Sequence, residues 1–104
     1  EAHAAAQHLL ALAREQSGDR DGARNHDEIA AYLDPNFAMP HLHLGLLARF
    51  AGDPARARRA FRRAIDLLGA EDSARILMFG GGFGRQALID LCQSELARID
   101  RERG

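Results

Sequence analysis

Apolar residues recur at steps of three and four along most of the chain, and this spacing places side chains on one side of an α-helix. The pattern is clearest over residues 41–68, where a Gly-Asp-Pro sequence at residues 52–54 interrupts it. Glycine suits the C-terminus of a helix, aspartate caps the next helix and proline fits its first turn. The stretch therefore predicts two helices, over residues 37–50 and 54–68, joined by a tight turn.

The same pattern occurs 34 residues earlier in the chain. We expect an earlier pair of helices over residues 2–16 and 20–33. Asp27 is an exception to the match, because the corresponding residue of the later pair is Phe61. The stripe expected to be buried on the first helix is Ala6, Leu9, Leu10 and Ala13. The matching positions are Leu44 and Leu10, Gly52 and Gly18, Asp53 and Asp19, Ala57 and Ala23, and Ala64 and Ala30.

Residues 73–79 (SARILMF) fit either a short helix or an extended segment, and a glycine-rich loop follows at residues 80–84. We expect Phe79 and Phe83 to anchor this loop in the core. A last helix is expected from residue 85 to about residue 101, packed as a cap on the second helical pair. The apolar face expected for it is Leu88, Leu91, Cys92, Leu96 and Ile99.

Composition supports an all-α fold. The chain has no valine, threonine or tryptophan and is rich in alanine, leucine and arginine, which favour helix over sheet. No run of eighteen apolar residues and no signal-peptide pattern occurs. We therefore expect a cytoplasmic protein without a membrane partner.

The charge pattern gives little support to a nucleic-acid partner. The formal net charge is −1, so no overall field attracts polyanions. Five arginines at residues 56–63 form a local basic surface, but the one aromatic residue among them, Phe61, lies on the apolar side of the expected helix and leaves none for base stacking. We expect a solvated face there and no nucleic acid.

The glycine-rich loop leaves a cofactor-binding alternative open. Residues 82–87 fit the pattern G-x-G-x-x-A, which outlines a dinucleotide or S-adenosylmethionine site when it follows a strand. That site needs a parallel sheet, and the chain supplies one candidate strand. We therefore expect the loop to act as a hinge and expect no cofactor. A cofactor-binding enzyme fragment built on residues 80–84 is the alternative.

Histidine and cysteine spacing predicts no metal site and no catalytic residue. His41 and His43 are two residues apart, and His3 and His8 are five apart, so each pair diverges on a helix. Cys92 lies on an apolar helical face without a histidine nearby in sequence, which favours a buried structural thiol.

A helix-turn-helix unit with a 34-residue period resembles the tetratricopeptide repeat (TPR). The resemblance implies two repeats, at about residues 4–36 and 38–70, in a single TPR-like domain over residues 1–104 with a C-terminal capping helix. We expect this domain to be a fragment of a longer protein. The residues that carry the resemblance are Leu44, Gly45, Gly52, Ala57, Phe61 and Ala64 in the second unit, and Leu10, Ala11, Gly18, Ala23, Ala30, Asp34 and Pro35 in the first.

In TPR proteins the first helix of each repeat lines a groove that holds peptides. The resemblance therefore implies a mostly apolar groove that binds an apolar helix or an extended segment. The alternative is that residues 73–79 or the last helix fill the groove. The implied lining is His8, Leu12 and Glu15 from the first unit and Met39, Leu42, His43, Leu46 and Arg49 from the second.

A narrower resemblance rests on residues 32–35 (YLDP), 39–49 (MPHLHLGLLAR) and 77–85 (LMFGGGFGR). These pieces are similar to the TPR region C-terminal to some bacterial chemotaxis-type (CheR-like) protein methyltransferases. The resemblance implies a non-catalytic docking region of an enzyme that uses S-adenosylmethionine to methylate protein glutamates in signal transduction. The implied partners are the methyltransferase domain itself, a chemoreceptor or a signalling protein. A stand-alone TPR adaptor is the alternative, and a homodimer is a further option.

Overall fold

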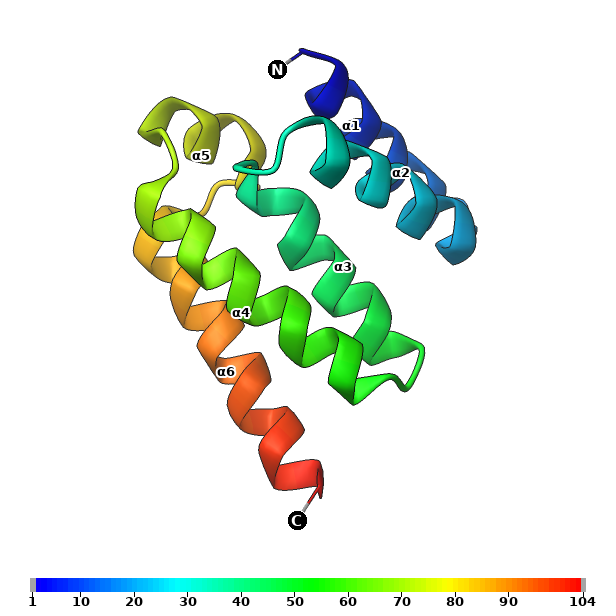
Figure 1. The fold of residues 1–104 in the computed structure, drawn as a ribbon, viewed down its shortest axis with the longest axis vertical. Helices are drawn as coiled ribbons and strands as arrows, with labels where there is room; N and C mark the ends of the chain where they lie inside the picture. Colours follow the sequence, from blue (N-terminus) through cyan, green and yellow to red (C-terminus); the bar gives the residue numbers. More distant parts are fainter. Residues whose placement is uncertain (1, 104) are drawn as a thin grey trace.

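The computed structural model describes residues 2–103, and every regular element in this range is an α-helix (Figure 1). The all-α prediction is therefore confirmed. The helices are α1 (Ala2–Gln16), α2 (Arg20–Leu33), α3 (Ala38–Phe50), α4 (Pro54–Ala70), α5 (Ser73–Phe79) and α6 (Arg85–Arg103). The helix α4 continues two residues beyond the expected end, and α6 also extends slightly further than expected.

The turns that join α1 to α2 and α3 to α4 have the same chemistry. Gly18 and Gly52 both have positive φ angles, of 87° and 77°, which glycine adopts without steric cost. The carboxylates of Asp19 and Asp53 accept hydrogen bonds from the backbone N–H three residues later, at 2.8 and 3.1 Å. These matched caps end and restart the helices where the sequence predicted.

The ambiguous segment 73–79 is the helix α5. Asp72 caps it by accepting a hydrogen bond from the backbone N–H of Ala74 at 3.1 Å. The guanidinium of Arg75 pairs with Asp34 at 2.9 Å and lies over the ring of Phe37 at 4.1 Å. These contacts fix α5 against the connection between α2 and α3.

The helices form two hairpins, the short helix α5 and a final helix. The helices α1 and α2 pack together, as do α3 and α4, and α3 also contacts α2 (Figure 1). The helix α6 packs along α4, the second helix of the second hairpin. In the same way, α3 packs against α2, the second helix of the first hairpin. Two ion pairs, Arg58 to Asp100 at 2.8 Å and Arg49 to Glu95 at 3.0 Å, hold it there.

The main apolar core belongs to the second hairpin and to the helices that follow it. Gly45 lies against the ring of Phe61, and a Cβ atom at position 45 would come within 2.7 Å of that ring. The absence of a side chain at Gly45 therefore permits close approach of α3 and α4. The buried residues of this core are Ala38, Leu42, Ala48, Ala57, Phe61, Ala64, Leu67, Leu68, Ile76, Leu88, Cys92 and Ile99.

The predicted buried stripe of α1 is wrong. Ala4, His8 and Ala11 face the interior, whereas Ala6, Leu9, Leu10 and Ala13 are exposed. The apolar residues of α1 are spread around most of its circumference, so their spacing does not indicate which face is buried. The polar contacts of His8, described below, select it.

Phe79 and Phe83 differ from each other. Phe79 is half-buried, with its ring centroid 5.2 Å from that of Phe37, whereas Phe83 is exposed. The core position expected for Phe83 is therefore wrong.

Among the described helices, none combines the length and the apolar character needed to cross a lipid bilayer.

Candidate functional site

Two histidines and an aspartate from three helices meet in the interior of the molecule. His8 of α1, Asp27 of α2 and His43 of α3 are 1%, 0% and 4% exposed. Asp27 Oδ1 accepts a hydrogen bond from His8 Nδ1 at 2.8 Å, and Asp27 Oδ2 accepts a short one from His43 Nδ1. We call these three residues the His–Asp–His cluster. It joins the first hairpin to the second through one carboxylate.

A second carboxylate extends the cluster to the surface. Glu15 Oε1 lies 2.6 Å from His43 Nε2, and the side chain of Glu15 is partly exposed. Both ring nitrogens of His43 thus face carboxylate oxygens, and both donate hydrogen bonds when the ring is an imidazolium. Burial opposes this charge, but the hydrogen bonds and charges of Asp27 and Glu15 outweigh it and raise the pKa of His43.

Aromatic rings enclose the buried side of the cluster. The ring centroids of Phe37 and Phe79 lie 5.5 and 6.2 Å from that of His8, both in edge-to-face orientations. Among the described residues, none offers a hydrogen-bond partner to His8 Nε2. Beside the cluster, Gln7 and His26 form a further polar contact between α1 and α2, at 2.7 Å.

The cluster occupies positions that are apolar in the second hairpin. A shift of 34 residues places Asp27 on Phe61 and His8 on Leu42, and both of these residues belong to the main core. The Asp27 mismatch was visible in the sequence, and His8 matched a core leucine in the same register. Reading those two positions together would have indicated a buried histidine–aspartate pair.

The groove residues inferred from the TPR resemblance divide into buried and exposed groups. His8, Leu42 and His43 are buried, and Met39 packs against the main core. They therefore belong to the interior instead of an open groove. Leu12 is exposed on α1. The remaining three, Glu15, Leu46 and Arg49, come together at one surface hollow.

This hollow lies where α1, the end of α3 and the end of α6 meet. Phe50 contributes an aromatic ring that is 68% exposed, and the guanidinium of Arg20 lies 3.6 Å from its centroid. Arg49 forms ion pairs with Glu95 and Glu102, each at 3.0 Å. We call this the Phe50 hollow; its lining residues are Glu15, Leu46, Arg49, Phe50 and Glu102.

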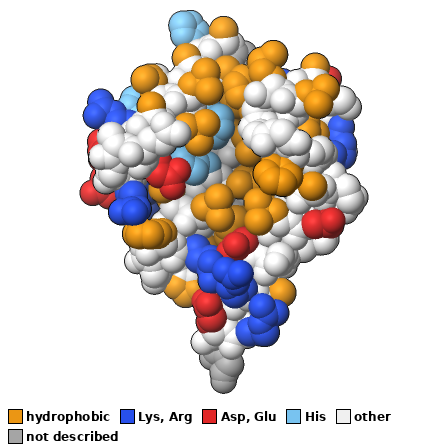
Figure 2. Space-filling model, turned by 180° about the vertical axis from the view of Figure 1, so that it is seen from behind, with side chains coloured by type: hydrophobic (Ala, Val, Ile, Leu, Met, Phe, Trp, Pro, Cys, Tyr) orange, Lys and Arg blue, Asp and Glu red, His pale blue; other side chains and the backbone are white. Residues whose placement is uncertain are grey.

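The face opposite to that of Figure 1 shows an uneven distribution of side-chain types. Hydrophobic side chains gather at its centre, and basic and acidic side chains lie directly below them (Figure 2). An apolar patch beside charged groups is typical of surfaces that contact other proteins.

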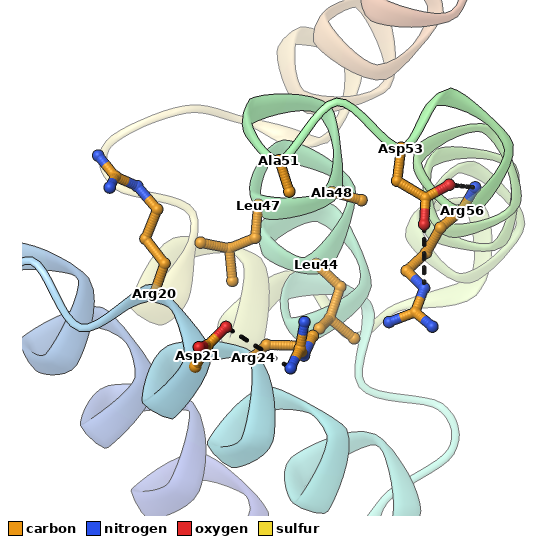
Figure 3. Close-up of a pocket in the computed structure, with 9 residues that line it drawn as sticks. All are labelled: Arg20, Asp21, Arg24, Leu44, Leu47, Ala48, Ala51, Asp53 and Arg56. Atoms are coloured by element: carbon orange, nitrogen blue, oxygen red, sulfur yellow. Dashed lines mark hydrogen bonds and ion pairs between the residues drawn. The ribbon is translucent and has the colours of Figure 1, made fainter.

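A second small pocket lies between the start of α2 and the turn that joins α3 to α4 (Figure 3). Its charged residues pair locally: Arg24 with Asp21 at 3.6 Å, and Arg56 with Asp53 at 3.7 Å. Apolar side chains of α3, such as Leu44 and Leu47, form its wall. Among the described residues that line it, none is a serine, threonine, cysteine or histidine.

The glycine-rich loop follows a helix, and the described residues 2–103 contain no strand. Gly81 and Gly82 have positive φ angles of 65° and 91°. The guanidinium of Arg85 donates hydrogen bonds to the backbone carbonyl of Leu68 and, at 3.2 Å, to the hydroxyl of Ser73. The loop is therefore a turn that brings α6 back to α4, as the hinge interpretation expected.

Comparison with known proteins adds no family assignment. A scan against models of protein families and a search of curated proteins each gave no match.

Proposed function

We propose that the chain is a non-catalytic helical-repeat module of the TPR type, which binds a segment of another protein at the Phe50 hollow. The observation that carries this proposal is the exposed ring of Phe50, which lies one helical turn from Leu46 and between charged side chains. Exposed aromatic residues of this kind are frequent anchors of protein interfaces.

The side chains around Phe50 are held in place before a partner arrives. Arg20 stacks on the ring from α2, and Arg49 is fixed by two glutamates of α6. His43 holds the carboxylate of Glu15. Such preorganisation lowers the entropy that is lost on binding.

The occupant that fits is an amphipathic helix or extended segment with a large apolar side chain. That side chain would pack on Phe50 and Leu46, and the polar side chains of the segment would meet the charged rim. Because Leu42 is buried in the main core, the accessible part of the groove is short. A segment of a few residues with a single anchor matches it.

The 34-residue match of the two hairpins supports the TPR part of the proposal. Both turns have the same glycine and aspartate caps, and α6 packs on α4 as α3 packs on α2. The second helix of each hairpin thus packs against a later helix, α3 in the first case and α6 in the second.

The parent protein that we propose is a chemotaxis-type, S-adenosylmethionine-dependent protein-glutamate methyltransferase of the bacterial cytoplasm. Support comes from the resemblance of residues 32–35, 39–49 and 77–85. The chain would then dock the catalytic domain, a chemoreceptor or a signalling protein. Sequencing the coding DNA upstream of Glu1 tests this: an α/β domain with a glycine-rich cofactor loop supports the parentage, and further 34-residue repeats alone favour a stand-alone adaptor.

The cofactor-binding alternative is tested by thermal unfolding. We expect neither S-adenosylmethionine nor NAD to raise the melting temperature, because the glycine loop follows the helix α5 instead of a strand. A rise that the Gly82→Val substitution abolishes would restore the alternative.

The binding proposal is tested with peptides selected from a displayed random library against the whole chain. We expect the Phe50→Ala substitution to weaken binding of a selected peptide by roughly tenfold or more, because it removes the apolar anchor. Tyr32→Ala is the matched control, since Tyr32 is an aromatic residue of α2 that is 85% exposed and lies outside the hollow. Equal affinity of both variants would refute the proposed site.

A further inference from the structure

The His–Asp–His cluster has the composition and the convergence of a metal-binding site. His8, Asp27 and His43 each offer a ligand atom, and these atoms all lie within 4.8 Å of one another. Imidazole nitrogens and one carboxylate oxygen, from three separate helices, form a ligand set that suits zinc and its neighbours among divalent transition metals. We propose that this cluster binds one such ion.

The spacing of the ligands requires little movement to accept an ion. Zinc lies about 2.0–2.2 Å from nitrogen and oxygen ligands, so a tetrahedral ion separates its ligand atoms by roughly 3.4 Å. His8 Nδ1 and Asp27 Oδ1 are 2.8 Å apart. The nitrogen and the oxygen of this pair therefore need to separate by only about half an ångström.

The ion would replace the protons that now bridge the cluster. His43 loses its Nδ1 proton to solvent, and the ring proton of His8 moves from Nδ1 to Nε2. Both Nδ1 lone pairs and an Asp27 oxygen then face the ion, and no other bond changes. Each ion bound to the imidazolium form of His43 releases one proton.

Glu15 stands where metal sites place an outer carboxylate. It contacts His43 Nε2 at 2.6 Å, on the side of the ring opposite to Asp27. A ligating histidine usually donates its second ring N–H to such a group, which fixes the ring and strengthens the ligand. This contact orients the Nδ1 atom of His43 toward the ligand set.

The position of the cluster in the fold also favours a metal-binding role over a purely structural one. The corresponding residues of the second hairpin, Phe61 and Leu42, complete the core with apolar side chains. A buried group of ionisable residues is less favourable for stability than such packing. Metal binding would account for polar residues at positions of the first hairpin that are apolar in the second.

The test is titration of the chelator-dialysed full chain with Zn²⁺ and Co²⁺. We expect one ion per chain by calorimetry and the visible absorption bands of bound Co²⁺. At a zinc concentration one hundred times the dissociation constant, we expect the melting temperature to rise by roughly 10 °C. Absence of both the cobalt bands and the rise in the wild-type chain would overturn the proposal.

Variants distinguish this site from adventitious surface binding. Asp27→Asn should abolish the cobalt bands, and Glu15→Gln should weaken zinc binding by about 10- to 100-fold. His41→Gln is the matched control, because His41 is a half-buried histidine of α3 outside the cluster. If the Asp27→Asn chain fails to fold, the zinc affinity of the Glu15→Gln chain is the deciding measurement, because Glu15 is partly exposed. Unchanged zinc affinity of the folded Asp27→Asn chain, or of Glu15→Gln where only that variant folds, would contradict the site.

Discussion

Asp27 and Phe61 lie 34 residues apart, and both are completely buried. Phe61 packs its ring against Gly45, whereas Asp27 accepts hydrogen bonds from two histidines. The side chain at this one position thus decides whether the interior beside it is packed with apolar side chains or held by a polar network. A buried polar network stabilises a fold only when its members are satisfied.

Removing the charge of Asp27 should therefore destabilise the chain strongly. In metal-free buffer, we expect Asp27→Asn to lower the free energy of unfolding by roughly 3 kcal/mol, because the amide cannot accept from both histidine N–H groups. Urea denaturation measures this change. Asp66→Asn, the same substitution at an exposed position of α4, should change stability by less than about 0.5 kcal/mol. Equal small effects of the two substitutions would contradict the assigned network.

Cys92 should be unreactive while the chain is folded. It is completely buried in the main core, and burial together with the negative charge of Glu95 raises the pKa of its thiol to about 11. The thiolate that reacts with alkylating reagents is therefore scarce at pH 8. We expect iodoacetamide to modify the chain in urea but not in native buffer, as mass spectrometry would show. Equal modification rates would place Cys92 at the surface instead.

For individual helices, the sequence predicted where each helix begins and ends better than it predicted which face of the helix is buried. The glycine and aspartate residues at the two tight turns act locally, so their roles follow from the residues themselves. The buried face of α1 depends on a contact with α2 and α3 that lies far away in sequence. Because α1 is apolar on most sides, its pattern left that choice open.

The contact between α3 and α4 can be tested with two glycines. We expect Gly45→Ala to destabilise the chain by roughly 1–3 kcal/mol, since the new Cβ would lie 2.7 Å from the buried ring of Phe61. Gly69→Ala should instead stabilise α4 by about 0.5–1 kcal/mol, because Gly69 is helical and an added Cβ atom would meet open space there. Thermal unfolding compares the two. A neutral or stabilising Gly45→Ala substitution would show that α3 and α4 are not closely packed there.

For the whole molecule, local patterns were enough to predict the all-α fold and every helix except α5, whose residues 73–79 also fitted an extended segment. They were not enough to predict the His–Asp–His cluster, since its residues come from three helices. The spacing of histidines within each helix gave no sign of it. The implied groove was affected for the same reason: contacts between helices bury His8, Leu42 and His43, whereas Glu15, Leu46 and Arg49 line a surface hollow.

The most direct test of binding at the Phe50 hollow is an NMR titration of the labelled chain with a peptide selected for binding. We predict that the largest amide shift changes occur around Glu15, Leu46 and Phe50 and at the end of α6. Amides near Ile29 and Tyr32 on the outer side of α2 should change little. Shift changes concentrated on α2, with none around Phe50, would contradict binding at the hollow and assign the interaction to a different surface.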